Sequence, residues 1–111
     1  MALYMHQVSY TLEAWQALVA KPQNRLDAIR PAIEKLGGKQ VAGWFSFGDY
    51  DINAITEFPD AVSAAAIAIA FAAGGSCRSV KTTQLLSTAE GLQALKLAGN
   101  TGYKSIAAAA R

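Results

Sequence analysis

The fold of this chain is decided by the segment Gly43–Ile52, which reads GWFSFGDYDI. Aromatic residues in its first half favour a β-strand, because large flat side chains suit a half-buried pleated surface. The pair Gly48–Asp49 favours a tight turn, and a second strand begins near Tyr50. The segment therefore predicts two strands joined by a short acidic turn, with a Tyr between two Asp residues at the tip.

The chain on either side of this hairpin alternates between strand and helix patterns. Capping residues mark the helix starts, and the pairs Gly37-Gly38 and Gly74-Gly75 end helical stretches. The order β-α-β-β-α-β with a short C-terminal helix predicts the α+β class and a ferredoxin-like two-layer sandwich. The predicted strands are Leu3–Tyr10, Lys39–Phe47, Tyr50–Phe58 and Cys77–Leu86; the predicted helices start at Leu12, run over 24–36 and Ala61–Ala73, and finish with a short helix from the Ser87 cap to Leu97.

The length of 111 residues suits one hydrophobic core. We expect a single domain over residues 1–98. The stretch 99–111 begins with Gly99 and Asn100 and ends in a run of Ala, so we expect a C-terminal tail that packs loosely or onto a neighbouring molecule.

Both faces of the predicted sheet carry apolar side chains. On the first strand, Tyr4 and Val8 lie on one side, and Leu3 and Met5 lie on the other. The helices cover one face, so the second face needs a partner. The helix Ala61–Ala73 is also apolar on nearly every side, and charged residues make up only 16% of the chain. The sequence predicts a homodimer or higher homo-oligomer, with two sheets face to face as in a dimeric α+β barrel.

Charge and composition exclude several classes of partner. The net charge is +2, and the Lys and Arg residues are scattered without a basic stripe, which argues against nucleic acid. The apolar run Ala61–Ala73 spans roughly 20 Å as a helix, short of the ~30 Å hydrocarbon core of a membrane. Cys77 is the only cysteine, and the first residues lack the pattern of a secretion signal. We therefore expect a cytoplasmic protein.

Few residues of the chain have side chains suited to catalysis or metal binding. His6 is the only histidine, and no second His or Cys lies at metal-ligand spacing, so the sequence predicts no metal site and no bound cofactor. Asp49 and Asp51 favour turn stabilisation over cation binding, since further oxygen ligands are missing. His6 forms a candidate acid–base pair with Asp51 or Asp49, because a nearby carboxylate tunes the pKa of an imidazole toward neutrality. A lone His in a strand is also typical of a hydrogen-bonded packing residue, and both interpretations stay open.

The aromatic residues of the first strand and the hairpin form a candidate ligand site. They are expected to line a concave space between the sheet and the helices, and to hold a small planar molecule. The alternative is that aromatic residues fill the core and the dimer face. The candidate ligand-binding residues are Tyr4, His6, Tyr10, Trp44 and Tyr50.

Several motifs resemble the GYD domain family of small bacterial proteins. They are Gly48-Asp49-Tyr50-Asp51 after an aromatic strand, the preceding Leu36-Gly37-Gly38-Lys39, the Ala-rich helix from Asp60, and the closing segment LLSTAE at 85–90. The likeness spans about Tyr4–Leu97, and Gly48, Tyr50 and Asp51 match the family signature. The resemblance implies a fold related in outline to dimeric α+β barrels and leaves the biochemical role open.

Three functions fit these observations. The first is a small oligomeric binding or accessory protein with an aromatic-lined pocket. The second is a cofactor-independent α+β barrel enzyme, an oxygenase or isomerase, that uses His6 and Asp51. The third is a purely structural assembly protein with the Ala-rich helix as its interface. The absence of a complete catalytic constellation in the sequence favours the first.

Overall fold

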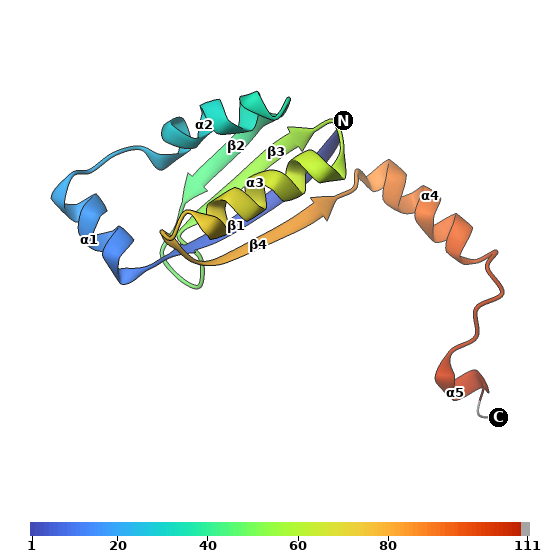
Figure 1. Cartoon of the computed structure of the whole chain (residues 1–111). Coiled ribbons are helices and arrows are strands. Elements are labelled where there is room, and N and C mark those ends of the chain that lie inside the picture. Colours follow the sequence, from blue (N-terminus) through green and yellow to red (C-terminus); the bar gives the residue numbers. More distant parts are fainter. Residues whose placement is uncertain (110–111) are drawn as a thin grey trace.

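The structure, a computed structural model, describes residues 1–109 as one four-stranded sheet with helices (Figure 1). The described strands are antiparallel and lie in the order β2-β3-β1-β4. This arrangement confirms the predicted α+β class and is compatible with a ferredoxin-like two-layer sandwich. The elements are β1 (Ala2–Tyr10), α1 (Leu12–Ala20), α2 (Arg25–Lys35), β2 (Lys39–Phe45), β3 (Ile52–Phe58), α3 (Ala61–Ala73), β4 (Cys77–Leu85), α4 (Thr88–Ala98) and α5 (Ile106–Ala109).

Capping residues start the helices where the sequence indicates. At the start of α3, an Asp60 carboxylate oxygen accepts a hydrogen bond from the Ser63 backbone N–H at 2.7 Å. At the start of α4, Ser87 and Glu90 form the predicted capping box, in which each side chain accepts from the backbone N–H of the other. These bonds supply partners for N–H groups that the first turn of a helix leaves unpaired.

The tip of the hairpin differs from the expectation. Both strands are shorter there than predicted, and residues 46–51 form a loop instead of a tight turn. Ser46 donates its hydroxyl to the carbonyl oxygen of Tyr50 at 2.6 Å, and Ser9 donates its hydroxyl to the carbonyl oxygen of Asp49 at 2.6 Å. Side-chain hydroxyls thus bind backbone groups that a longer strand ladder would use, so the ladder ends earlier.

The core lies between the sheet and the helices on one of its faces. Phe58 on β3, Ile33 on α2 and Ile67 on α3 are buried together in one cluster. A second cluster joins Val8 and Ile52 to side chains of α1 and α2. Residues directly opposite in the β1–β3 register share a face, so the even-numbered residues of both strands point toward the helices.

No described helix covers the other face of the sheet (Figure 1). Leu3, Met5 and Ile55 lie on this face and are only partly buried. Trp44 on β2 is paired with Asn53 and is 59% exposed. The described chain therefore leaves apolar surface on the face that the sequence expects a partner to cover.

Helix α4 leaves the sandwich at the end of β4 and extends away from it (Figure 1). It contains no buried residue, and Leu92, Leu95 and Leu97 are exposed. The radius of gyration is 18.0 Å, whereas a compact chain of this length has about 13 Å. The protruding arm accounts for the difference. Residues 110–111 of the expected tail lie outside the described residues.

We predict that Gly38→Ala destabilises the domain by about 1–3 kcal/mol, because a Cβ atom at this position would overlap the buried ring of Phe58. Gly48→Ala is the matched control, since a Cβ atom there meets no atom within 4 Å. Urea unfolding of both variants checks this. Equal stability of the two variants would contradict the proposed packing constraint.

Candidate functional site

An inner cavity of about 210 Å³ lies between the sheet and the helices α2 and α3. Its walls are mostly apolar and contain a few polar groups, which is the usual character of a small-molecule site. The lining residues come from β1, α2, β3, α3, the segment before β4 and the first residue of β4: His6, Val8, Tyr10, Arg25, Ile29, Ile52, Ala54, Ala70, Phe71, Gly74, Ser76 and Cys77.

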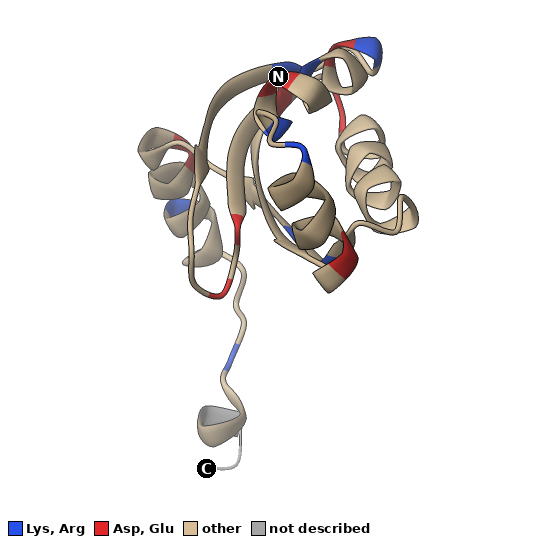
Figure 2. Ribbon diagram, turned by 90° about the vertical axis from the view of Figure 1, so that its left-hand side faces the viewer, with Lys and Arg blue, Asp and Glu red and all other residues tan. Residues whose placement is uncertain are grey.

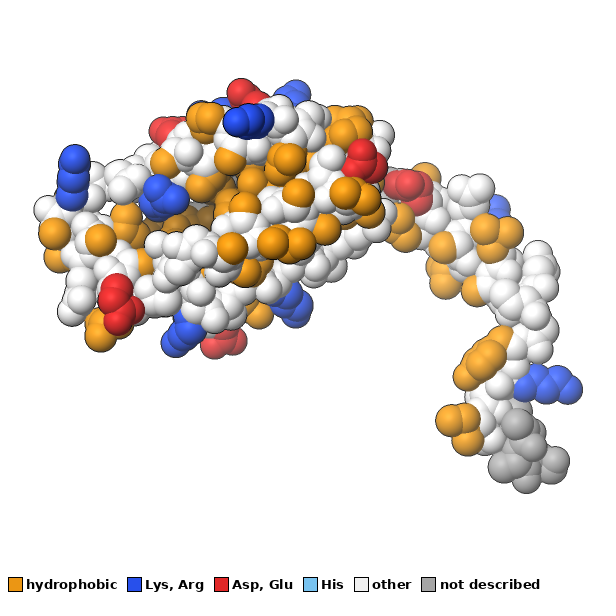
Figure 3. Space-filling model, in the orientation of Figure 1, with side chains coloured by type: hydrophobic (Ala, Val, Ile, Leu, Met, Phe, Trp, Pro, Cys, Tyr) orange, Lys and Arg blue, Asp and Glu red, His pale blue; other side chains and the backbone are white. Residues whose placement is uncertain are grey.

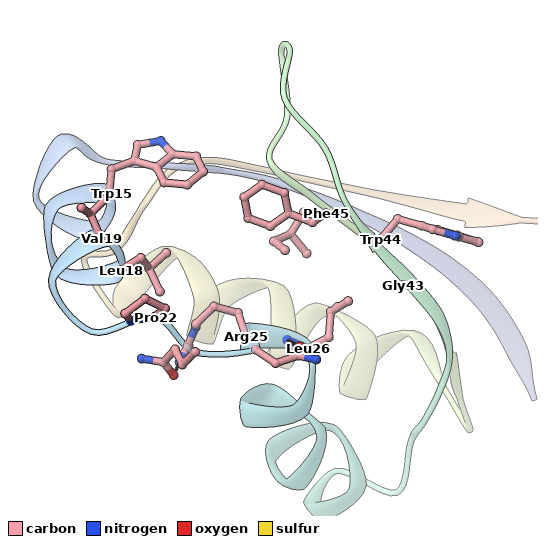
Figure 4. A pocket seen from close by; sticks show the side chains of 12 residues that line it. Trp15, Leu18, Val19, Pro22, Arg25, Leu26, Gly43, Trp44 and Phe45 are labelled. Carbon is pink, nitrogen blue, oxygen red and sulfur yellow. Dashed lines mark hydrogen bonds between the residues drawn. The ribbon is translucent and has the colours of Figure 1, made fainter.

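An outer hollow of about 570 Å³ lies next to this cavity, between α1, the start of α2 and β2 (Figure 4). Trp15 forms edge-to-face contacts with Tyr10 at 5.4 Å and with Phe45 at 5.8 Å between ring centroids. Arg25 and Ile52 line both spaces, so the two are adjacent. In the space-filling view this region is a recess with hydrophobic side chains inside it (Figure 3).

His6 is held in the wall of the inner cavity by two hydroxyl groups. Its Nε2 atom lies 2.8 Å from the Thr56 hydroxyl and its Nδ1 atom lies 2.9 Å from the Thr82 hydroxyl. Burial lowers the pKa of His6 from 6.5 to about 4, so the imidazole is neutral at pH 7. The ring also makes edge-to-face contact with Phe71 at 6.1 Å. His6 is thus a hydrogen-bonded packing residue that presents a neutral ring.

Arg25 acts on two ionisable groups of the inner cavity. Burial raises the pKa of Tyr10 above its usual 10.0, and Arg25 works in the opposite direction through its charge and a side-chain hydrogen bond. Burial also raises the pKa of the Cys77 thiol, and the charge of Arg25 again opposes this. Both side chains therefore stay protonated at neutral pH, and Arg25 supplies the formal charge in the cavity wall.

Asp51 lies at the end of the hairpin loop and binds the backbone of β1. Its carboxylate accepts the backbone N–H of Tyr10 at 2.9 Å, and its own N–H donates to the carbonyl oxygen of Val8 at 2.8 Å. The hydrogen bonds of His6 go to other residues. The structure therefore gives the two members of the candidate acid–base pair separate partners and does not bring them together.

The other candidate ligand-binding residues lie in different places. His6 and Tyr10 both line the inner cavity. Tyr4 is buried beside Phe58 in the core, with 6.2 Å between the ring centroids. Tyr50 lies in the hairpin loop and is half-buried. Trp44 borders the outer hollow, but its side chain points away from the Trp15–Phe45 pair (Figure 4).

Sequence reasoning missed Trp15, Phe71 and Arg25 as lining residues. Trp15 and Phe71 belong to apolar helical stripes, which predict burial without saying which stripe residue meets a cavity. The position of Arg25 could have been predicted from the sequence. It lies four residues before Ile29 and therefore on the same, partly buried side of α2. A cation on the apolar side of a helix is the pattern that would have identified it.

Residues 1–109 show neither a metal cluster nor a membrane-spanning helix. That part of the chain contains no group of three or more His, Cys, Asp and Glu residues placed to hold a metal ion. None of its helices is both long and apolar enough to cross a membrane. Charged residues are distributed over several elements without a dominant patch (Figure 2).

Comparison with known proteins identifies a family. A family model described as GYD domain matches residues 4–95, which include the hairpin with Gly48, Tyr50 and Asp51. This match confirms the resemblance found in the sequence. Neither the search of curated proteins nor the search of solved structures gave a match.

We predict that part of the unfolding free energy is lost as the pH falls from 6.5 toward 4. Unfolded His6 takes up a proton near 6.5 and folded His6 only near 4, so the unfolded state binds more protons between these values. The loss is on the order of 1–3 kcal/mol. Urea unfolding over this pH range checks it.

The control for this prediction is His6→Gln, which keeps a polar side chain but does not titrate. The difference in stability between the original chain and this variant isolates His6 from the carboxylates that also titrate at low pH. If the difference does not change between pH 6.5 and 4, then burial does not keep His6 neutral.

Proposed function

The chain belongs to the GYD domain family, and we propose that it is a small oligomeric accessory protein that binds a small planar molecule between its sheet and its helices. The observation that carries the proposal is the inner cavity, which adjoins the outer hollow through Arg25 and Ile52. Together they offer an apolar space with a few polar groups. We assign this function to the cytoplasm, since the free, half-buried Cys77 thiol suits a reducing compartment.

The hydrogen bonding of the candidate catalytic residues supports binding over catalysis. A general acid or base must reach the substrate and exchange a proton near the working pH. His6 has a pKa of about 4 and has hydroxyl partners for both ring nitrogens, while the Asp51 carboxylate accepts from the backbone of Tyr10. An oxygenase or isomerase that used this pair would first have to break these bonds.

Uncovered apolar surface supports assembly of the chain with copies of itself. The open face of the sheet contains Leu3, Met5 and Ile55, with Trp44 exposed beside them. The exposed leucines of α4 form a second uncovered surface. An exposed helix with an apolar stripe is stabilised when another surface buries that stripe. A second copy of the same chain can supply this surface in a symmetric dimer.

We predict that a neutral apolar dye, phenylnaphthylamine, binds one molecule per chain and becomes fluorescent. Ala70→Phe should weaken this binding about tenfold or more, since Ala70 lines the inner cavity and a ring there would occupy its volume. Ala72→Phe is the matched control, because Ala72 lies on the same helix, is exposed and does not line either space.

Fluorescence titration of the three proteins separates the candidate functions. Loss of binding in the first variant alone supports the ligand site. Absence of dye binding to the original chain would overturn the proposal and leave the purely structural role. Turnover of an aromatic substrate that is lost in His6→Ala would favour the enzyme instead.

We predict that the chain is a dimer or a larger multiple, and that Leu95→Glu raises its dissociation constant about tenfold or more. Leu95 is 72% exposed, so the substitution buries no charge in the single chain and should leave the unfolding of the isolated domain unchanged. Gln93→Glu on the same helix is the control for added charge. Sedimentation equilibrium measures the assembly, and a monomeric original chain would contradict the prediction.

A further inference from the structure

Arg25 occupies a special position in the site. It is the first residue of α2 and lines both the inner cavity and the outer hollow. Its side chain is half-buried, and one Nη atom donates to the Gln23 side-chain oxygen at 3.0 Å. A guanidinium has five N–H donors in a planar fork, so this bond and the hydrogen bond to Tyr10 leave further donors for other partners.

The charge of Arg25 has no carboxylate partner among residues 1–109. The ion pair recorded in that part of the chain joins Arg30 to Asp27 at 3.1 Å on the outer side of α2. No Asp or Glu lines either the inner cavity or the outer hollow. Asp51 is the acidic residue that acts on Tyr10, and its carboxylate already accepts the Tyr10 backbone N–H. The two spaces therefore combine apolar walls with one uncompensated positive charge.

We propose that the ligand is a monocarboxylic acid with a flat apolar body, whose carboxylate binds Arg25 while its body lies in the inner cavity against His6 and Phe71. This inference rests on the proposed function and deepens it. The Tyr10 hydroxyl is close to the guanidinium and provides a second donor for the same carboxylate. Arg and carboxylate groups match in shape and form two parallel charge-assisted hydrogen bonds.

The rest of the cavity fits this class of ligand. His6 is neutral and the thiol of Cys77 is protonated, so neither side chain adds a charge to the cavity wall that would repel or attract a second ionic group. The rings of His6 and Phe71 stand nearly perpendicular to each other, with an interplanar angle of 89°. The two rings contact each other, and both line the inner cavity, so a flat apolar body can pack against the pair. One cation also matches a monoanion better than a dianion.

The test compares naphthalene carboxylate with its uncharged isostere, naphthalene carboxamide, by isothermal titration at neutral pH. The original chain should bind the carboxylate more tightly than the amide. Arg25→Gln should weaken binding of the carboxylate by roughly ten- to a hundredfold and leave binding of the amide unchanged. Arg30→Gln is the matched control, since it removes the same charge from the same helix at a residue that lines neither space.

The outcomes separate this inference from the proposed function. If the original chain binds the two probes equally well, or if Arg25→Gln leaves carboxylate binding unchanged, the carboxylate assignment is overturned and the ligand site stands. If neither probe binds the original chain, both proposals are overturned. Binding of the amide by Arg25→Gln shows that the cavity of this variant is intact. If the variant does not fold, the comparison of the two probes on the original chain tests the carboxylate assignment by itself.

Discussion

The pairing of β1 with both of its neighbours is the constraint on which the rest of the structure depends. β1 lies inside the sheet and bonds to β3 on one side and β4 on the other. Because side chains alternate along a strand, a slip of one residue would turn His6 and Tyr10 toward the open face. The bonds of Asp51 to Val8 and Tyr10 tie the hairpin loop to this strand. The loop thus helps to hold the register that forms the cavity.

The same register places hydrogen-bond partners around the buried side chain of His6. His6 lies opposite Ala54 on β3 and Thr82 on β4, and a threonine from each neighbouring strand reaches one of its ring nitrogens. A buried imidazole without these bonds would cost on the order of a few kcal/mol. With them both ring nitrogens have partners, and burial lowers the pKa so that the ring is neutral, which removes the one histidine from acid–base chemistry near pH 7.

Much of the fold was predictable from the sequence, because capping residues and alternation report local geometry directly. The sequence did not predict which side of each strand faces the helices. Tyr4 and His6 alternate with Leu3 and Met5, and either set is able to fill a core. The end of the hairpin was misplaced because Ser46 binds the loop backbone locally and Ser9, which is distant in sequence, also binds it. Of the candidate site residues on β1, His6 and Tyr10 line the inner cavity and Tyr4 lies in the core. Arg25 was not predicted as a lining residue, because its place in the cavity wall depends on how α2 packs against β1 and α3.

The inner cavity and the point where α4 departs lie at opposite ends of the sheet. Tyr10 is paired with Cys77 at the end that forms the inner cavity, and Leu3 is paired with Leu85 at the end from which α4 departs. Along an extended strand these ends are roughly 23 Å apart. The open face also lies on the side of the sheet away from the helices. A second copy that covers α4 and the open face would lie on the other side of the sheet from the inner cavity and would meet the outer hollow at Trp44. Assembly and ligand binding are therefore compatible in one particle.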